Sequence, residues 1–226
     1  GAAFGGDPAD GAIKPLMGLD YKKVTGLEDY KPAGNAKAAK ALMEKAKTTC
    51  PAEYAKATDP KRGLVFDTAD SETNKKGAAI WIDSMMKNAG IVMKFNFIEP
   101  GSYYAVVLDA TKQSDLSAGG WAPDWANAST VIPELFTKEG GFNLSQNWND
   151  AAYAAFKKKS DATKVETDRA KQAKGWQELS QYVMDQYWII RPVFSKTQNV
   201  WGSKVGGVYY WEPQGNFGFG QMYVKN

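Results

Sequence analysis

The segment from residue 63 to residue 98 constrains the fold more than any other part of the chain. Its first run, Gly63-Leu64-Val65-Phe66-Asp67, is short and apolar and predicts a buried strand. A helical pattern follows from Ser71 to Gly90, and residues 91–98 form a second run of strand type. A strand, a helix of about five turns and a second strand predict a βαβ unit with parallel strands and a right-handed crossover. The sequence therefore predicts an α/β fold with a mostly parallel sheet.

Further elements are predicted on both sides of this unit. Asn35 is placed to cap a helix that ends near Lys47, and residues 48–62 read as a polar loop. A short helix is expected at 103–108 and a third strand at 115–121. The helix after Ser71 is expected to carry its apolar stripe on Ala79, Ile82, Met85, Met86 and Ala89.

Two more helices are predicted in the second half of the chain. The first runs from residue 149 or 150 to about 159, and Thr163 to Glu166 is a capping box that would open the second. The apolar spacing of the second helix predicts that it buries Ala173, Trp176, Leu179, Val183 and Tyr187. The following run meets Pro192, which favours a strand end or an edge position there.

The chain divides into three parts by composition. Residues 1–34 are rich in Gly, Pro and Asp and predict an extended segment with no core of its own. Residues 35–200 carry the helix and strand patterns and are expected to form one α/β lobe. Residues 201–226 are rich in Gly and aromatic residues, which predicts loops and short strands that need an outside surface to pack on.

Composition excludes several functional classes. The chain has 226 residues, no His and one Cys, so it contains no Ser-His-Asp triad, no Cys-His pair and no His-rich zinc site. We expect no catalytic residues, no metal site and no cofactor. The net charge is only +3, and the Lys residues are interspersed with Asp and Glu rather than clustered. Both features argue against nucleic acid as a partner. No run reaches the ~18–20 apolar residues that a membrane-spanning helix requires.

One motif suggests a family. Gly119-Gly120-Trp121-Ala122-Pro123-Asp124 is followed by a stretch that ends in Leu135-Phe136. With this motif, the order of the elements resembles the C-terminal lobe of the extracellular solute-binding proteins of family 5, the dipeptide and oligopeptide binders of ABC transporters. Four other segments agree with the family pattern in order and spacing: Tyr30 to Ala46, Asn143 to Asn149, Asp168-Arg169 and Arg191-Pro192-Val193.

The resemblance implies a periplasmic-binding-protein-like fold of type II, with a mixed, mostly parallel sheet flanked by helices. It implies a second lobe before Gly1, with residues 1–34 arriving from the hinge and residues 201–226 returning toward it. It also implies a monomer that captures di- or oligopeptides and delivers them to ABC permease subunits in the membrane. We therefore expect an extracellular or cell-envelope lipoprotein whose lipidated N-terminus is absent from this chain.

The candidate site lies on the loop that begins at Trp121. Ligands of open α/β sheets bind beyond the carboxyl ends of strands, so this loop is expected to face a cleft. In the peptide-binding relatives, the Asp that matches Asp124 holds the ligand's α-ammonium, and charge-assisted hydrogen bonds suit that role. Trp121 and Trp125 are expected to flank the ligand, with Gly120 and Ala122 beside them, because Gly120 permits close approach of a peptide backbone. The alternative is that Asp124 caps a turn and both Trp residues are core.

Two other groups are weaker candidates. Asn143 and Trp148, with Asn147 between them, form a polar and aromatic group that is expected to line the rim of the cleft. Tyr103 follows a predicted strand end, which is also a cleft-facing place. For both groups the alternative is a structural role, since a loop Asn more often caps or turns the chain.

Other functions remain as alternatives. The same fold would bind an oligosaccharide or another solute if the Trp residues stacked on sugar rings, and a ligand sensor or interaction module would use the same closure. A glycosidase requires two carboxylates flanking one bond. Asp115 and Asp124 stand at opposite ends of a predicted strand about 20 Å long, so we do not expect an enzyme.

Overall fold

The computed structural model describes residues 6–26, 34–143, 149–190, 193–196, 199–211 and 216–225. These residues form two compact units. The sheet unit comprises residues 34–119, and the helical unit comprises the described parts of 6–26 and 120–225. This division differs from the boundaries near residues 34 and 200 that composition suggests. Each unit is described by itself.

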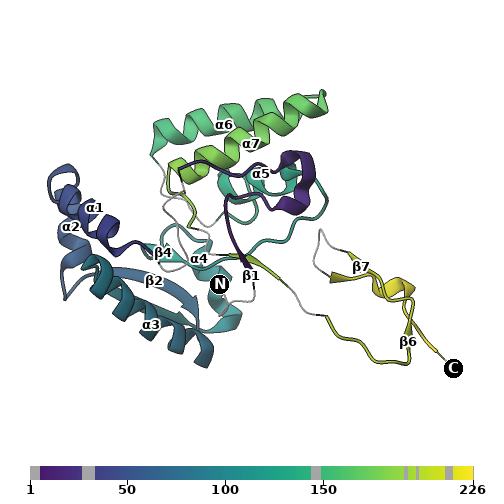
Figure 1. The fold of residues 1–226 in the computed structure, drawn as a ribbon, viewed down its shortest axis with the longest axis horizontal. Helices are drawn as coiled ribbons and strands as arrows, with labels where there is room; N and C mark the ends of the chain where they lie inside the picture. Colours follow the sequence, from purple (N-terminus) through teal and green to yellow (C-terminus); the bar gives the residue numbers. More distant parts are fainter. Residues whose placement is uncertain are drawn as a thin grey trace. The chain divides into compact units, whose positions relative to one another are not determined.

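The sheet unit contains the predicted βαβ unit (Figure 1). Strands β2 (Leu64–Ala69) and β3 (Met93–Ile98) pair in parallel from Leu64 opposite Met93 to Ala69 opposite Ile98. Helix α3 (Glu72–Ala89) connects them. It starts where the Ser71 side chain accepts a hydrogen bond from the Asn74 backbone N–H, and it ends at Gly90 in the left-handed region, with φ of 70°. The α/β fold class is therefore confirmed.

The third strand of this sheet is shorter than predicted. Strand β4 (Leu116–Ser117) pairs in parallel with β2 and gives the strand order β3-β2-β4. The predicted strand at 115–121 is therefore wrong at both ends. Asp115 uses its carboxylate to accept a hydrogen bond from the Val65 backbone N–H. Beyond Ala118 the sequence Gly119-Gly120 disfavours a strand.

The helices of the sheet unit differ from the prediction in two respects. Residues predicted as a polar loop form α2 (Pro51–Thr58), because Pro is well suited to the first position of a helix. The predicted stripe of α3 is also rotated: Ala78 is buried, whereas Ile82 and Met86 are 42% and 48% exposed. The remaining helices are α1 (Ala36–Thr49), η3 (Pro100–Ser102) and α4 (Tyr103–Val107).

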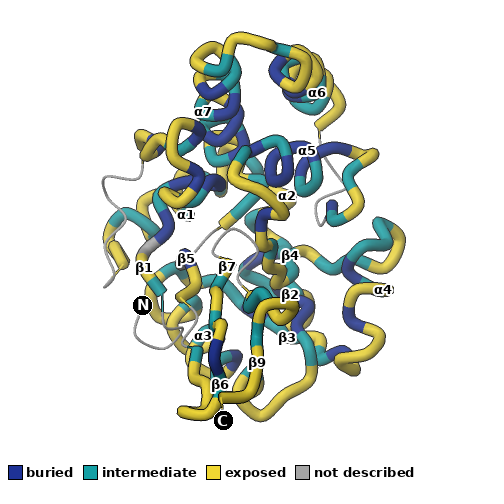
Figure 2. The backbone as a smooth tube through the Cα atoms, turned by 90° about the vertical axis from the view of Figure 1, so that its right-hand side faces the viewer, coloured by how far each residue is buried: buried dark blue, intermediate teal, exposed yellow. Residues whose placement is uncertain are grey.

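The helical unit is built around α6 (Asp150–Val165) and α7 (Arg169–Asp185), which pack against each other (Figure 1). Trp176, Leu179 and Val183 of α7 are fully buried, as their spacing predicts. The core also contains residues of η2 (Pro15–Asp20), η4 (Ala128–Thr130) and α5 (Ile132–Phe136). Figure 2 shows buried segments on α5, α6 and α7, with intermediate and exposed residues along the rest of α6 and α7.

Two predictions about the ends of these helices are wrong. Thr163 does not open α7: it is buried within α6, and α7 begins after Asp168, whose carboxylate accepts hydrogen bonds from the first turn. Tyr187 is 85% exposed rather than buried. Its φ of 54° ends the helix in the left-handed region, and the Trp188 N–H bonds back to the Val183 carbonyl at 3.0 Å.

The early residues of the chain belong to this core. Ala12, Ile13 and Met17 are almost completely buried in the same cluster as Trp176 and Phe156. The prediction that residues 1–34 form an extended segment is wrong at η2, which is helical. The described part packs against helices more than 100 positions later in the sequence. Gly11 permits this close packing, because a Cβ at that position would lie 3.2 Å from Ser180 Oγ and 3.3 Å from Val24 Cγ1.

The end of the chain forms short strand pairs, in keeping with its sequence. Strand β5 (Val193–Ser195) pairs antiparallel with β1 (Gly6–Pro8). The other pairs are β6 (Val205–Gly206) with β9 (Tyr223–Val224) and β7 (Tyr210–Trp211) with β8 (Asn216–Phe217), near η5 (Phe219–Gln221). In the part of the chain that the structure describes, no helix has the length and apolar character needed to cross a membrane.

Candidate functional site

The candidate site lies on residues 120–130, here called the Asp124 loop, which ends in η4. Thr130 organises this loop. Its buried hydroxyl accepts a hydrogen bond from the Asp124 backbone N–H at 3.2 Å and donates one to Asp124 Oδ2 at 2.7 Å. Its carbonyl oxygen accepts a hydrogen bond from the Trp121 indole Nε1 at 2.6 Å. One buried residue therefore fixes both leading candidates of the sequence analysis.

The carboxylate of Asp124 is available to a cation. Asp124 is exposed, and its hydrogen bonds in the described structure are those with Thr130. Among the described residues, no Lys or Arg forms an ion pair with it. A carboxylate held in place by a neutral hydroxyl can still accept hydrogen bonds from an external cation, and hydrogen bonds between charged groups are the stronger kind.

The aromatic residues of the loop differ in their exposure. Trp121 is half-buried against the helical core, and its ring centroid lies 5.2 Å from that of Phe142. Trp125 is 53% exposed, and its indole Nε1 donates to Ser129 Oγ at 3.2 Å. Trp125 therefore offers more open aromatic surface than Trp121.

Gly120 and Ala122 are both exposed. A Cβ added at Gly120 would meet nothing within 4 Å, so the fold itself does not require glycine at this position. Open space next to a backbone is what an extended ligand would need in order to pair with it. The role of Gly120 and Ala122 in ligand binding remains a prediction.

The weaker candidates lie elsewhere. Asn143 is only 3% exposed, and its amide donates to the Thr137 carbonyl oxygen at 2.9 Å. Tyr103 belongs to the sheet unit, is 6% exposed, and donates from its hydroxyl to the Asp67 and Ala118 carbonyl oxygens. These contacts give both side chains a structural role. Trp148 and Asn147 lie outside the described residues.

The chain resembles known proteins in structure rather than in sequence. No protein-family model matches the sequence, and no curated protein matches it. Solved structures do match over nearly the whole chain. The oligopeptide binding protein 2 of clavulanic acid biosynthesis matches with a TM-score of 0.75 at 19% identity, over 98% of this chain and 39% of its own.

Two further neighbours have the same character. The murein tripeptide binding protein MppA of Escherichia coli matches with a TM-score of 0.72 at 19% identity, over 98% of this chain and 41% of its own. OppA of Haemophilus influenzae, solved in complex with the peptide RPPGFSPFR, matches with a TM-score of 0.66 at 17% identity, over 98% and 41%.

The chain has the fold of type II periplasmic binding proteins.

The chain spans about 40% of the length of the binding proteins whose structures it matches. The predicted fold class is confirmed, and the match covers both the sheet unit and the helical unit. At identities of 15–20% the likeness carries the fold alone.

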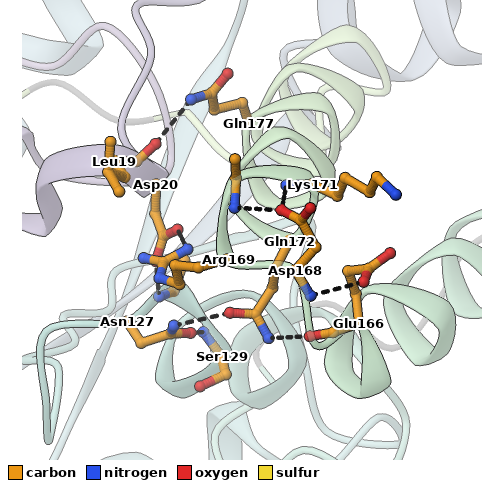
Figure 3. Close-up of polar contacts among 12 residues, drawn as sticks. Leu19, Asp20, Asn127, Ser129, Glu166, Asp168, Arg169, Lys171, Gln172 and Gln177 are labelled. Carbon is orange, nitrogen blue, oxygen red and sulfur yellow. Dashed lines mark hydrogen bonds and ion pairs between the residues drawn. The ribbon is translucent and has the colours of Figure 1, made fainter.

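Sequence reasoning did not predict which residues hold the Asp124 loop in place through buried or partly buried contacts. They are Asp20, Asn127, Thr130, Arg169 and Gln172, and Figure 3 shows the polar contacts of most of them. The pairing of Asp20 with residues 128 and 169 leaves no signal in the sequence, because it joins positions more than 100 residues apart.

Proposed function

We propose that the chain is the ligand-binding part of a family 5 solute-binding protein that captures di- or oligopeptides for an ABC transporter. One observation carries the proposal: Asp124 is an exposed carboxylate, fixed by Thr130, with no cationic partner among the described residues. The fold supports it, because the matching structures include an oligopeptide binding protein, a murein tripeptide binding protein and an OppA in complex with a peptide.

In this proposal Asp124 accepts hydrogen bonds from the α-ammonium of the peptide. Trp121 and Trp125 supply aromatic surface beside it, and Gly120 and Ala122 leave room for the peptide backbone. Burying an ammonium is costly unless it meets an opposite charge, so the carboxylate would select ligands with a free amino terminus.

The rest of the proposal concerns the whole protein. A second lobe would close over the ligand by a hinge motion, and the closed monomer would deliver it to permease subunits in the membrane. The protein would reside outside the cytoplasmic membrane, held by a lipid anchor. No bond would be made or broken in this chain, so it would not be an enzyme.

A second candidate keeps the fold and changes the ligand. Trp125 is 53% exposed on the same loop, and an exposed indole stacks on a sugar ring as well as on a peptide. An oligosaccharide carries no ammonium and would not need the charge of Asp124. The Asp124 variant therefore separates the two ligand classes.

The test is calorimetric titration of the full-length protein with trialanine and with N-acetyl-trialanine. We expect Asp124→Asn to weaken binding of the free-amine peptide by about 30-fold, which is about 2 kcal/mol, because a hydrogen bond to a charged group is lost. Binding of the acetylated peptide should change little.

The matched control is Asp161→Asn. Asp161 is an exposed carboxylate of α6 that pairs with Lys157, and its replacement should leave both affinities unchanged. Equal affinities of wild-type protein and Asp124→Asn for trialanine would refute the ammonium role.

A further inference from the structure

A buried ion pair connects η2 to the start of α7. The Asp20 side chain has no exposed surface, and its Oδ1 lies 2.6 Å from Arg169 Nη1. Neither of these two buried atoms has a hydrogen-bond partner in the described structure, so their ion pair compensates both charges. Gln177 of α7 adds a second link, because its amide donates to the Leu19 carbonyl oxygen at 2.7 Å (Figure 3).

The other oxygen of Asp20 reaches the Asp124 loop. Its Oδ2 accepts a hydrogen bond from the Ala128 backbone N–H at 2.8 Å, in a fully buried contact. Ala128 is the first residue of η4, and Thr130 is the last. Thr130 holds both Asp124 and Trp121. Asp20 therefore anchors the chain at Ala128, two positions before the residue that fixes the candidate ligand residues.

A separate contact ties the same turn to α7. The Asn127 side chain caps η4 by accepting from the Ser129 N–H at 2.9 Å, and its amide donates to Gln172 Oε1 at 3.1 Å. Gln172 in turn donates to the Glu166 carbonyl oxygen at 3.2 Å (Figure 3). Side-chain hydrogen bonds therefore attach the C-terminal part of the Asp124 loop to α7, whereas Asp124 itself remains exposed.

We propose that Asp20 is a positioning residue for ligand binding at Asp124, acting through Ala128 and Thr130, with Arg169 as the counter-ion that holds Asp20 in place. This inference rests on the proposed function, in which Asp124 receives an ammonium. A buried, charge-assisted hydrogen bond holds the turn in one position. A carboxylate binds its ligand more tightly when its own position is fixed before binding. Asp20 itself touches no ligand.

Asp20→Asn tests this role in the full-length protein. The substitution keeps the shape of the side chain but removes the charge that pairs with Arg169. The quantity to measure is the ratio of affinities for trialanine and N-acetyl-trialanine, which reports on Asp124 alone. We expect this ratio to fall about tenfold, since the hydrogen bond to the ammonium loses its alignment. In an Asp124→Asn background, Asp20→Asn should change the ratio by less than about twofold, because the two residues act in series.

Asp10→Asn is the matched control. Asp10 lies on the same early segment and accepts a hydrogen bond from the Tyr21 hydroxyl at 2.7 Å, but within the described residues it forms no hydrogen bond or ion pair with the Asp124 loop. Its replacement perturbs the packing of the segment and should leave the affinity ratio unchanged. A purely structural role for Asp20 would lower the melting temperature in the same way and also leave the ratio unchanged, which would overturn the proposal.

Amide hydrogen exchange provides a readout that needs no ligand. Asp20→Asn should speed exchange at the Ala128 and Asp124 N–H groups by about tenfold or more, while the control leaves both protected. Unchanged exchange at Asp124 would contradict the positioning role even if no peptide binds. Absence of peptide binding by the wild-type protein, together with faster exchange in the variant, would refute the proposed function and leave the mechanical link intact.

A second variant covers the case in which Asp20→Asn does not fold. The Arg169 side chain is 40% exposed, so Arg169→Gln opens no closed cavity while it removes the counter-ion. We expect it to lower the affinity ratio and to speed exchange at Asp124. Wild-type values for both quantities would overturn the proposal.

Discussion

At the scale of single residues, Asp67 shows how a buried charge is accommodated in the sheet unit. The residue lies in β2 and has no exposed surface. Its Oδ2 accepts from the Ser114 N–H at 2.8 Å, and its Oδ1 accepts from the Ser114 hydroxyl at 2.7 Å and the Asn96 amide at 2.8 Å. These three donors join β3 and the segment before β4 to the central strand.

We expect Asp67→Asn to lower the free energy of unfolding by about 2 kcal/mol. The NH2 group of the new Asn would face the hydrogen-bond donors of Ser114 or Asn96, so at least one hydrogen bond would be lost. Asp70→Asn is the control, since Asp70 is 43% exposed and pairs with Lys75 at the surface. That change should cost less than about 1 kcal/mol. Urea unfolding measures both values, and equal costs would contradict the role of the buried network.

Sequence reasoning finds candidate site residues that share one motif more easily than it finds buried anchors. Trp121 and Asp124 stand together in one short motif, so their proximity is visible in the sequence. Asp20 and Asp67 are single acidic residues among many, and only the fold shows that they are buried and bonded. The same limit explains Asn143, whose burial and bond to Thr137 no local pattern reveals.

At the scale of elements, the close approach of α6 and α7 depends on one glycine. A Cβ added to Gly175 would lie 2.5 Å from Thr163 Oγ1 and 2.7 Å from Thr163 Cγ2. The two helices therefore meet at a point where the absence of a side chain on α7 makes room for a threonine of α6.

Gly175→Ala should destabilise the protein by about 2 kcal/mol, because the crowded contact outweighs the better helix propensity of alanine. Gly77→Ala on α3 is the matched control, since its Cβ would meet nothing within 4 Å. That change should stabilise the protein by up to about 1 kcal/mol. Denaturant unfolding gives the sign of the change in stability for both variants. Stabilisation by Gly175→Ala would show that the helices are not packed in this way.

The interiors of the elements are more predictable than their ends. The stripe of Trp176, Leu179 and Val183 and the βαβ pattern follow from periodicity, because each repeats over several turns or strands. The ends depend on single contacts. Asp168 caps α7 instead of Thr163, and Tyr187 takes a left-handed conformation that favours glycine, which places its ring in solvent.

At the scale of the whole molecule, both units contain a tyrosine whose pKa is raised to about 12, so that it resists ionisation. Burial, reinforced by the Asp10 carboxylate, raises the pKa of Tyr21 in the helical unit to about 12. Burial also raises the pKa of Tyr103 in the sheet unit to about 12. Both ordinary values are 10.0, so folding favours the protonated form of each residue.

The stability that these tyrosines contribute should therefore be complete below pH 10 and be lost as the pH rises from 10 to about 12. Denaturant unfolding at several alkaline pH values measures this loss. Tyr103→Phe should make the loss smaller, because the variant has no phenol to ionise at that position. If Tyr103→Phe lost as much stability with rising pH as the wild-type protein, the raised pKa of Tyr103 would be contradicted.

The division of the chain into two units is a property that local patterns do not contain. Residues 6–26 join the helical unit although the sheet unit separates them from it in the sequence. The resemblance to a known family predicted the fold class, and the structural neighbours confirm it while spanning more than twice the length of this chain. Their greater length makes the ligand a question for the full-length protein.

Native mass spectrometry of the full-length protein, purified from its own host, tests the central claim most directly. The account predicts a series of bound masses that match short peptides with free amino termini, and a loss of these masses in Asp124→Asn. A single bound mass that matches an oligosaccharide, retained in Asp124→Asn, would contradict the peptide claim and assign recognition to the tryptophan surfaces.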